Sequence, residues 1–285
     1  MALTINTNIS SLVAQKNLTR ATNGLNNAIE RMTTGYKINK ASDNAAGYSI
    51  AKNWEVKLSS LDIASDNAAT ASDMLATMED NCNLIASHLQ RVKDLTEQAA
   101  NGTYGDTSRT AIKSEITARL DEIDRIAANC EFNDIHLLNG DKDDTGITFQ
   151  VGLDGTSNSR ITVDKDVFKD ASSTTILSAI GATKDAIATN CSGASAADQL
   201  TALKNAINSI SSRITAIGAA GNRIDSAIES ISVQSENITS SLSTLRDADI
   251  ASESSKYIQA QILQQAASTL LSTANQTPSI ALNLL

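Results

Sequence analysis

Two long segments place an apolar residue at alternating steps of three and four, the heptad spacing by which one helix packs along another. The first segment covers residues 61–99 and the second covers residues 203–245. Long helices are permitted because proline, which breaks helix interiors, occurs once in 285 residues, at Pro278. We predict two long helices that pack through Leu75, Ile85, Leu89, Val92, Ile210, Ile217, Ile224 and Ile231.

Shorter helices are expected at both ends of the chain, over residues 14–32 and 260–274, and a further helix over residues 112–127. Apolar residues alternate at 147–151 and again at 161–163, on either side of a turn-rich segment, which predicts a β-hairpin. The fold expected from these patterns is mainly α: an elongated hairpin of long coiled-coil helices with a small β-hairpin and with the N- and C-termini paired.

The same patterns divide the chain into three expected regions. Residues 1–42 and 247–285 form a terminal helical domain, and residues 43–165 and 198–246 form a rod-like domain that carries the β-hairpin. Residues 166–197 are rich in serine, threonine and alanine and show only weak helical spacing. We predict that they form a short, variable outer segment.

Both ends of the chain lack charge. Residues 1–15 and 257–285 contain no Asp, Glu, Lys or Arg, although 19% of the whole chain is charged. A helix that is covered on all sides avoids charge, because burying an unpaired charge is costly. Two slender helices cannot cover each other completely, so we expect other copies of the chain to cover them, with the ends folding on assembly. This physical argument leaves closed rings and open helical filaments as alternatives.

Several function classes are disfavoured. The net charge of −9 repels phosphate backbones, so no nucleic-acid partner is expected. The first fifteen residues contain no Lys or Arg and no apolar run of signal-peptide length, so we expect no cleaved signal peptide. The uncharged C-terminal stretch is too polar for a membrane span, so no membrane insertion is expected. The three cysteines are too few and too widely spaced to suggest a zinc cluster. No catalytic or phosphate-binding motif occurs, so neither an enzyme nor a cofactor is expected.

Several sequence blocks are distributed over nearly the whole chain, apart from about residues 166–197. The N-terminal half carries INTNISSLVAQKNL, RMTTGYKINKASDNAAGYSIA, QRVKDLTEQAANGTYGD, EIDRIAANCEFN and LLNG. The C-terminal part carries AGNRIDSAIESI and LRDADIASESSKYIQAQILQQAASTLLSTANQTPSIALNLL. Together these blocks resemble bacterial flagellin.

The resemblance implies a structural subunit that polymerises into the flagellar filament for motility. It implies export through the flagellar type III apparatus, an export chaperone at the C-terminal helix, and hook-associated and cap proteins as further partners. The subunit is then secreted into a filament that is external or periplasmic. The residues expected to pack in the filament core are Leu18, Leu25, Met32, Ile258, Ile262, Leu263 and Leu270.

Members of the flagellin family are also bound by Toll-like receptor 5, and the RVKDLTEQ block is similar to the motif involved. The resemblance assigns receptor contacts to Arg91, Leu95 and Glu115. A plainer interpretation of these three residues, which we favour as their primary role, is contact between neighbouring subunits.

Two rival functions stay open at this point. A hook–filament junction protein shares similar termini, and electron microscopy distinguishes it because it does not elongate into long filaments. A non-polymeric coiled-coil binding module is the second rival, and for that class the neutral ends would be incidental.

Overall fold

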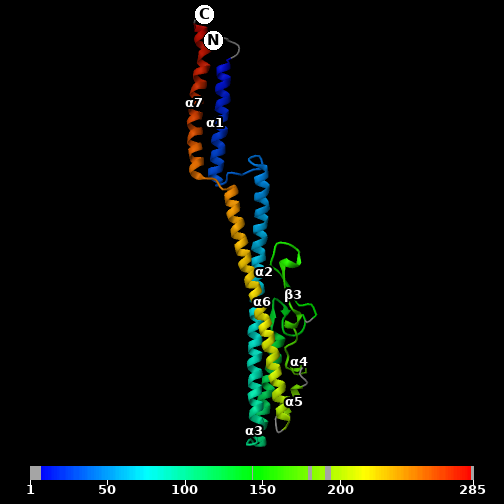
Figure 1. Ribbon diagram of the computed structural model, residues 1–285. Coiled ribbons are helices and arrows are strands. Elements are labelled where there is room, and N and C mark those ends of the chain that lie inside the picture. The colour runs from blue at the N-terminus through cyan, green and yellow to red at the C-terminus, as the bar shows by residue number, and fades with distance from the viewer. Residues whose placement is uncertain (1–7, 143, 179–181, 190–193, 284–285) are drawn as a thin grey trace. The chain divides into compact units, whose positions relative to one another are not determined.

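The computed structural model describes residues 8–142, 144–178, 182–189 and 194–283 (Figure 1). The chain divides into a terminal unit, Met1–Leu58 with Glu236–Leu285, and a central unit, Ser59–Ser235. The terminal unit is larger than the expected residues 1–42 and 247–285, because the start of one long helix and the end of another belong to it. Among the described helices, none has an apolar stretch long enough to cross a bilayer.

The terminal unit is built on helices α1 (Ile9–Thr34) and α7 (Ile250–Asn283), which run antiparallel (Figure 1). Asn8 caps α1 by accepting a hydrogen bond from the backbone N–H of Ser11, and its side-chain amide donates to the carbonyl oxygen of Ala274 at 2.7 Å. At the other end of the pair, Arg31 and Glu253 form an ion pair at 3.5 Å. The expected pairing of the two terminal helices is confirmed.

Helix α1 ends at Gly35, whose φ of 73° lies in the left-handed region that glycine adopts without strain. The following segment turns back over the end of helix α6 (Ala194–Arg246). The Lys37 N–H donates to the carbonyl oxygen of Arg246 at 2.7 Å, and the Ala248 N–H donates to that of Gly35 at 2.8 Å. Helix α2 (Ala45–Ala100) then begins, with the Asn44 side chain accepting from the Gly47 N–H.

The central unit holds one continuous apolar core formed by α2, α3 (Asp106–Asn129) and α6. All eight residues named for the long-helix seam are at most 5% exposed. Helix α2 begins at Ala45, earlier than residue 61, where the heptad spacing starts. Heptad spacing indicates where a helix packs along a partner, and it does not indicate where the helix begins.

The predicted β-hairpin forms from β3 (Ile147–Gln150) and β4 (Arg160–Val163). Its antiparallel register pairs Ile147 with Val163 and Phe149 with Ile161, which places the alternating apolar residues on one face. A second, very short hairpin, β1 (Glu131–Phe132) with β2 (Ile135–His136), was not predicted. Its turn residues, Asn133 and Asp134, both have positive φ.

The described parts of residues 166–197 pack on the helices of the central unit. Two short 3₁₀ helices, Ser157–Ser159 and Lys165–Val167, come before and at the start of this segment. Helices α4 (Ser173–Ser178) and α5 (Lys184–Thr189) follow and pack on α3. Phe168, Ile176 and Ile187 are buried in the same core as the long helices. Lys184 Nζ contacts Asp121 at 2.7 Å and Asp124 at 2.6 Å, tying α5 to α3. Residues 179–181 and 190–193 of this segment, which include the third cysteine, Cys191, lie outside the described residues.

Candidate assembly surface

The seam between α1 and α7 is lined with alanine. The buried apolar side chains of the pair are Ala14, Ala21 and Ala28 from α1 and Ala260 and Ala267 from α7. Small side chains let two helices approach closely, and they leave no room between the helices for larger ones. The large apolar side chains of both helices are therefore displaced to the flanks and the outer faces.

The outer faces carry a surface of large apolar side chains. On α7, the side chains of Ile258, Ile262, Leu263 and Leu270 are 51–63% exposed. On α1, those of Ile9, Leu12 and Val13 are 53–69% exposed. Most of the strongly exposed large apolar side chains among the described residues lie in the terminal unit. Large apolar side chains exposed together on one pair of helices mark an interaction site.

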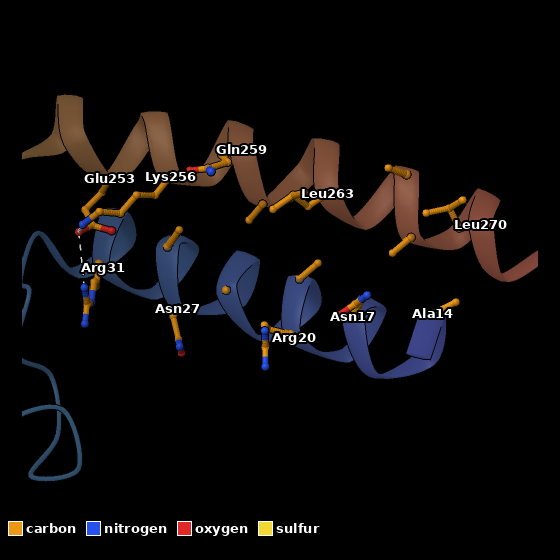
Figure 2. Close-up of a pocket in the computed structure, with 16 residues that line it drawn as sticks. Ala14, Asn17, Arg20, Asn27, Arg31, Glu253, Lys256, Gln259, Leu263 and Leu270 are labelled. Atoms are coloured by element: carbon orange, nitrogen blue, oxygen red, sulfur yellow. Dashed lines mark hydrogen bonds and ion pairs between the residues drawn. The ribbon is translucent and has the colours of Figure 1, made fainter. Parts of the chain in front are cut away.

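A groove of about 620 Å³ runs along the helix pair, as Figure 2 shows. Alanine side chains line it, Leu263 and Leu270 stand beside it, and Arg31, Glu253 and Lys256 lie at one end (Figure 2). A second groove of about 440 Å³ shares Ala14, Asn17 and Leu270 with the first and extends to Ile9 and Val13. The helix pair is therefore hollowed along much of its described length.

The polar contacts of this pair are mostly neutral away from its charged end. The side-chain amide of Gln264 donates to the hydroxyl of Thr22 at 3.2 Å, and the Ser11 hydroxyl donates to Asn275 Oδ1 at 2.7 Å. Glu253 is buried between Arg31 and Lys256, with its carboxylate 2.7 Å from Lys256 Nζ. Charge is thus paired at one end, and the surface formed by residues beyond Lys256 is neutral and apolar.

The residues expected in the filament core fall into two groups. Leu18, Leu25 and Met32 are half-buried along the flank of α1, whereas the four named residues of α7 are exposed in the single chain. The heptad pattern missed Ile9, Leu12 and Val13, because these residues lie off the stripe that contains Ala14 and Leu18. The signal that identifies them is the uncharged, apolar character of the N-terminal segment.

The three residues assigned to receptor contact lie in the central unit and differ in exposure. Arg91 and Glu115 are joined by an ion pair, with Arg91 Nη2 3.0 Å from Glu115 Oε1, and Arg119 lies 3.9 Å from the same oxygen. Leu95 is only 2% exposed and belongs to the core. The structure therefore presents the two charged residues at the surface, while Leu95 packs beneath them.

Comparisons with known proteins identify the family. Residues 5–143 match the model of the bacterial flagellin N-terminal helical region, and residues 200–285 match that of the C-terminal helical region. The chain is 32% identical to a flagellin of Listeria monocytogenes over 99% of both chains. It is 43% identical to polar flagellin F of Vibrio parahaemolyticus over 49% of this chain and 37% of that relative.

Among solved structures, one described as a flagellar hook-associated protein from Vibrio parahaemolyticus aligns with a TM-score of 0.54 at 18% identity, covering 72% of this chain and all of that one. At that identity the likeness shows a shared fold only. The full-length match to a flagellin and the matches to both family regions identify the same family. The exposed apolar surface of the terminal unit is consistent with a subunit that polymerises. The chain belongs to the bacterial flagellin family and is a structural subunit of the flagellar filament.

Proposed function

We propose that the exposed face of α1 and α7 is the contact between copies in the filament core. The observation that carries this proposal is the combination of large exposed apolar side chains on α7 with the absence of charge from residues 257–285. The groove beside Leu263 and Leu270, which is lined largely by alanine, supplies space for a side chain of a neighbouring helix. The exposed face and the groove together form a surface that a second copy can cover.

The energetics favour polymerisation. Fully burying a Leu or Ile side chain contributes about 1.5–3 kcal/mol, so completing the burial of four half-exposed side chains on α7 contributes several kcal/mol per subunit. Residues beyond Lys256 add no charge that must be desolvated, which removes the main opposing cost of burying such a surface.

A single substitution tests the surface. We expect Ile262→Lys to lower the yield of sedimentable polymer by at least tenfold, because it places a charge in the proposed contact. Ile262→Leu is the matched control and should polymerise like the parent chain. Since Ile262 is exposed, both variants should melt like the parent as monomers. Normal filaments from Ile262→Lys would contradict the proposal.

Deleting residues 258–285 tests the same surface more severely. The shortened chain should stay in solution and form no polymer, which electron microscopy measures directly. Long filaments from the parent chain favour the filament subunit, and short structures that fail to elongate favour the hook–filament junction protein. Polymers that survive the deletion would favour an assembly surface elsewhere.

A receptor interaction is a second proposal, and it concerns the central unit. The Arg91–Glu115 pair is at the surface, so its charges are available to Toll-like receptor 5, while Leu95 holds α2 in place from within the core. Purified monomer should bind the receptor ectodomain, and Arg91→Ala should weaken that binding. Equal binding by the two proteins, or binding by neither, would reject the assignment.

We also propose that the chain leaves the cell through the flagellar export apparatus, with a chaperone covering the apolar face of α7 beforehand. The support is that this face is exposed in the single chain and needs cover until assembly. Ile262→Lys should then weaken capture by the chaperone, measured by co-purification. The flagellin family is structural, and we propose no catalytic activity for this chain.

A further inference from the structure

Three Asn–Gly pairs occur in the chain, at Asn23–Gly24, Asn101–Gly102 and Asn139–Gly140. An asparagine followed by glycine can deamidate without an enzyme, because the next backbone nitrogen attacks the side-chain carbon Cγ and glycine has no Cβ to obstruct the approach. The reaction needs a mobile backbone and an attacking N–H that is not held in a hydrogen bond. The structure allows the three pairs to be compared on those requirements.

The first pair is protected by its helix. Gly24 lies inside α1, where each backbone N–H donates to the carbonyl four residues earlier and the helical backbone holds the attacking nitrogen in the ladder. Substantial unwinding of α1 would have to precede the reaction there. Asn23 should therefore be stable in the folded chain, even though its side chain is exposed.

The second pair, Asn139–Gly140, is restrained by its neighbours. The Asn139 side-chain amide donates to Asp141 Oδ2 at 2.8 Å, and the Asp141 N–H donates back to Asn139 Oδ1 at 3.0 Å. A Cβ built on Gly140 would lie 3.3 Å from Asp170 Cβ, so the backbone there is closely approached. The adjacent Asp141 carboxylate also opposes the negative charge that develops on the attacking nitrogen.

The third pair is the most open of the three. Asn101, Gly102 and Thr103 are all exposed in the turn between α2 and α3, and a Cβ built on Gly102 would meet no atom within 4 Å. The Gly102 N–H donates no hydrogen bond to any of the described residues. Asn101 Oδ1 accepts hydrogen bonds at 3.1 Å from both the Thr103 N–H and the Thr103 hydroxyl, whereas Asn139 Oδ1 accepts one, from the Asp141 N–H. The two bonds to Asn101 Oδ1 draw electron density away from Cγ.

A cation lies beside this pair. Arg109 Nη2 donates to the Asn101 carbonyl oxygen at 3.5 Å, while Arg109 Nε is buried without a hydrogen-bond partner among the described residues. A nearby guanidinium stabilises negative charge on the attacking nitrogen and on the oxygen of the tetrahedral intermediate. It also stabilises the carboxylate of the product.

We propose that Asn101 is a site of spontaneous deamidation in the folded chain. The Gly102 nitrogen loses its proton to solvent base and forms a bond to Asn101 Cγ, and the side-chain nitrogen leaves as ammonia. The resulting five-membered succinimide is then opened by water at either carbonyl, giving an aspartyl or an isoaspartyl residue. The net reaction consumes one water and one amide and yields a carboxylate and ammonium, with no oxidation or reduction.

The product alters the turn between α2 and α3. A new negative charge appears next to Arg109, and the isoaspartyl form adds a backbone methylene within the turn. The fraction of modified subunits therefore increases with the age of the subunits, because the reaction is not reversed by water alone.

The test compares the three pairs within one protein. The purified full chain is incubated in mildly alkaline buffer, folded or in urea, and digested samples are examined by mass spectrometry for conversion of amide to acid and for isoaspartate. In the folded chain, the Asn101 peptide should convert at least fivefold faster than the Asn139 and Asn23 peptides. In urea, the three rates should converge, because the structural protection of the other two is removed.

Gly102→Ala supplies the matched control. Open space around Gly102 and its negative φ allow alanine without strain, so the variant should fold normally. It should slow conversion at Asn101 at least fivefold and leave the Asn139 peptide unchanged. The proposal is overturned if Asn101 converts no faster than Asn139 in the folded chain, or if Gly102→Ala leaves its rate unchanged.

Discussion

Arg246 shows at the scale of one residue how the terminal unit is held together. Its guanidinium pairs with the Glu55 carboxylate, lies 4.1 Å from the centre of the Tyr36 ring and donates to the Ile38 carbonyl oxygen at 3.3 Å. These contacts join the last turn of α6 to the start of α2 and to the segment that follows α1. One side chain of α6 thus holds two segments that lie about 190 to 210 residues earlier in the sequence.

Replacing Arg246 should therefore destabilise the terminal unit. We expect Arg246→Ala to lower its free energy of unfolding by about 1–3 kcal/mol, because it removes charge-assisted hydrogen bonds and leaves Glu55 with one partner fewer. Thermal unfolding followed by circular dichroism measures the change. Lys57→Ala, at an exposed position of α2, is the control and should change stability by less than about 0.5 kcal/mol. An unchanged melting curve for Arg246→Ala would contradict this interpretation.

Glu55 gives the same region a dependence on pH. A hydrogen bond from Lys52, together with the positive charge of Arg246, lowers the pKa of the Glu55 carboxyl. A lowered folded-state pKa adds stability above the unfolded-state pKa, and that stability is lost as the pH falls through the folded-state value. We expect Glu55→Gln to reduce the acid-induced loss of stability, measured as melting temperature against pH. Identical pH profiles for the variant and the parent would exclude this contribution.

At the scale of elements, the alanine seam determines how closely α1 and α7 approach. A Cβ built on Gly24 would lie 3.9 Å from the Cβ of Ala260, an ordinary van der Waals contact. Ala28 is only 3% exposed, so a larger side chain at that position has no space. Position 24 therefore has room for a methyl group, whereas position 28 has no room for a bulky side chain.

Two substitutions in α1 test this difference. Gly24→Ala should stabilise the helix pair by about 0.5–1 kcal/mol, because alanine restricts the unfolded chain and favours the helix. Ala28→Leu should destabilise the pair by about 1–3 kcal/mol through overpacking. Thermal unfolding of the two variants side by side gives the answer. A melting temperature for Ala28→Leu that equals or exceeds that of Gly24→Ala would exclude a close seam.

The long-helix seam of the central unit makes a similar prediction for α2. Ile85 is fully buried, whereas the adjacent Leu84 is 49% exposed. Ile85→Ala should cost about 2–5 kcal/mol because it leaves a cavity, and Leu84→Ala should change stability by less than about 0.5 kcal/mol. Urea unfolding of the two variants measures both changes. Equal losses would mean that α2 is not packed by one face.

At the scale of the whole molecule, two buried thiols report on the opening of the central unit. Burial raises the pKa of Cys82 to about 11 and that of Cys130 to about 12. Both thiols are free and lie in the core, so at neutral pH they are protonated and shielded. Their reaction with an alkylating reagent requires the core to open.

We expect Cys82 and Cys130 in the folded chain to be alkylated at least a hundredfold more slowly than in the urea-unfolded chain, because only opened molecules react. The measurement uses a Cys191→Ser background, since Cys191 lies outside the described residues. Mass spectrometry of quenched samples gives the rates. Rapid, stoichiometric labelling of the folded chain would show that this core is not closed.

Much of the architecture was predictable from local patterns. The heptad stripes, the scarcity of proline and the alternation at residues 147–163 predicted the long helices and the hairpin, because helix and strand periodicities are local properties of the chain. The absence of charge from residues 257–285 likewise predicted that this helix is covered by other copies, which stays a prediction because its large apolar side chains are exposed in the single chain. These signals require only the identity of a residue and its spacing from its neighbours.

Other features depended on contacts between residues distant in the sequence. The burial of Phe168 and Ile187, the capture of Lys184 by two carboxylates of α3 and the depth of Leu95 beneath Arg91 all arise where separate segments meet. The choice among the three Asn–Gly pairs is of the same kind, because an identical dipeptide is protected in a helix and open in an exposed turn. Spacing along the chain predicts which face of a helix is apolar, but only the tertiary fold determines what covers that face.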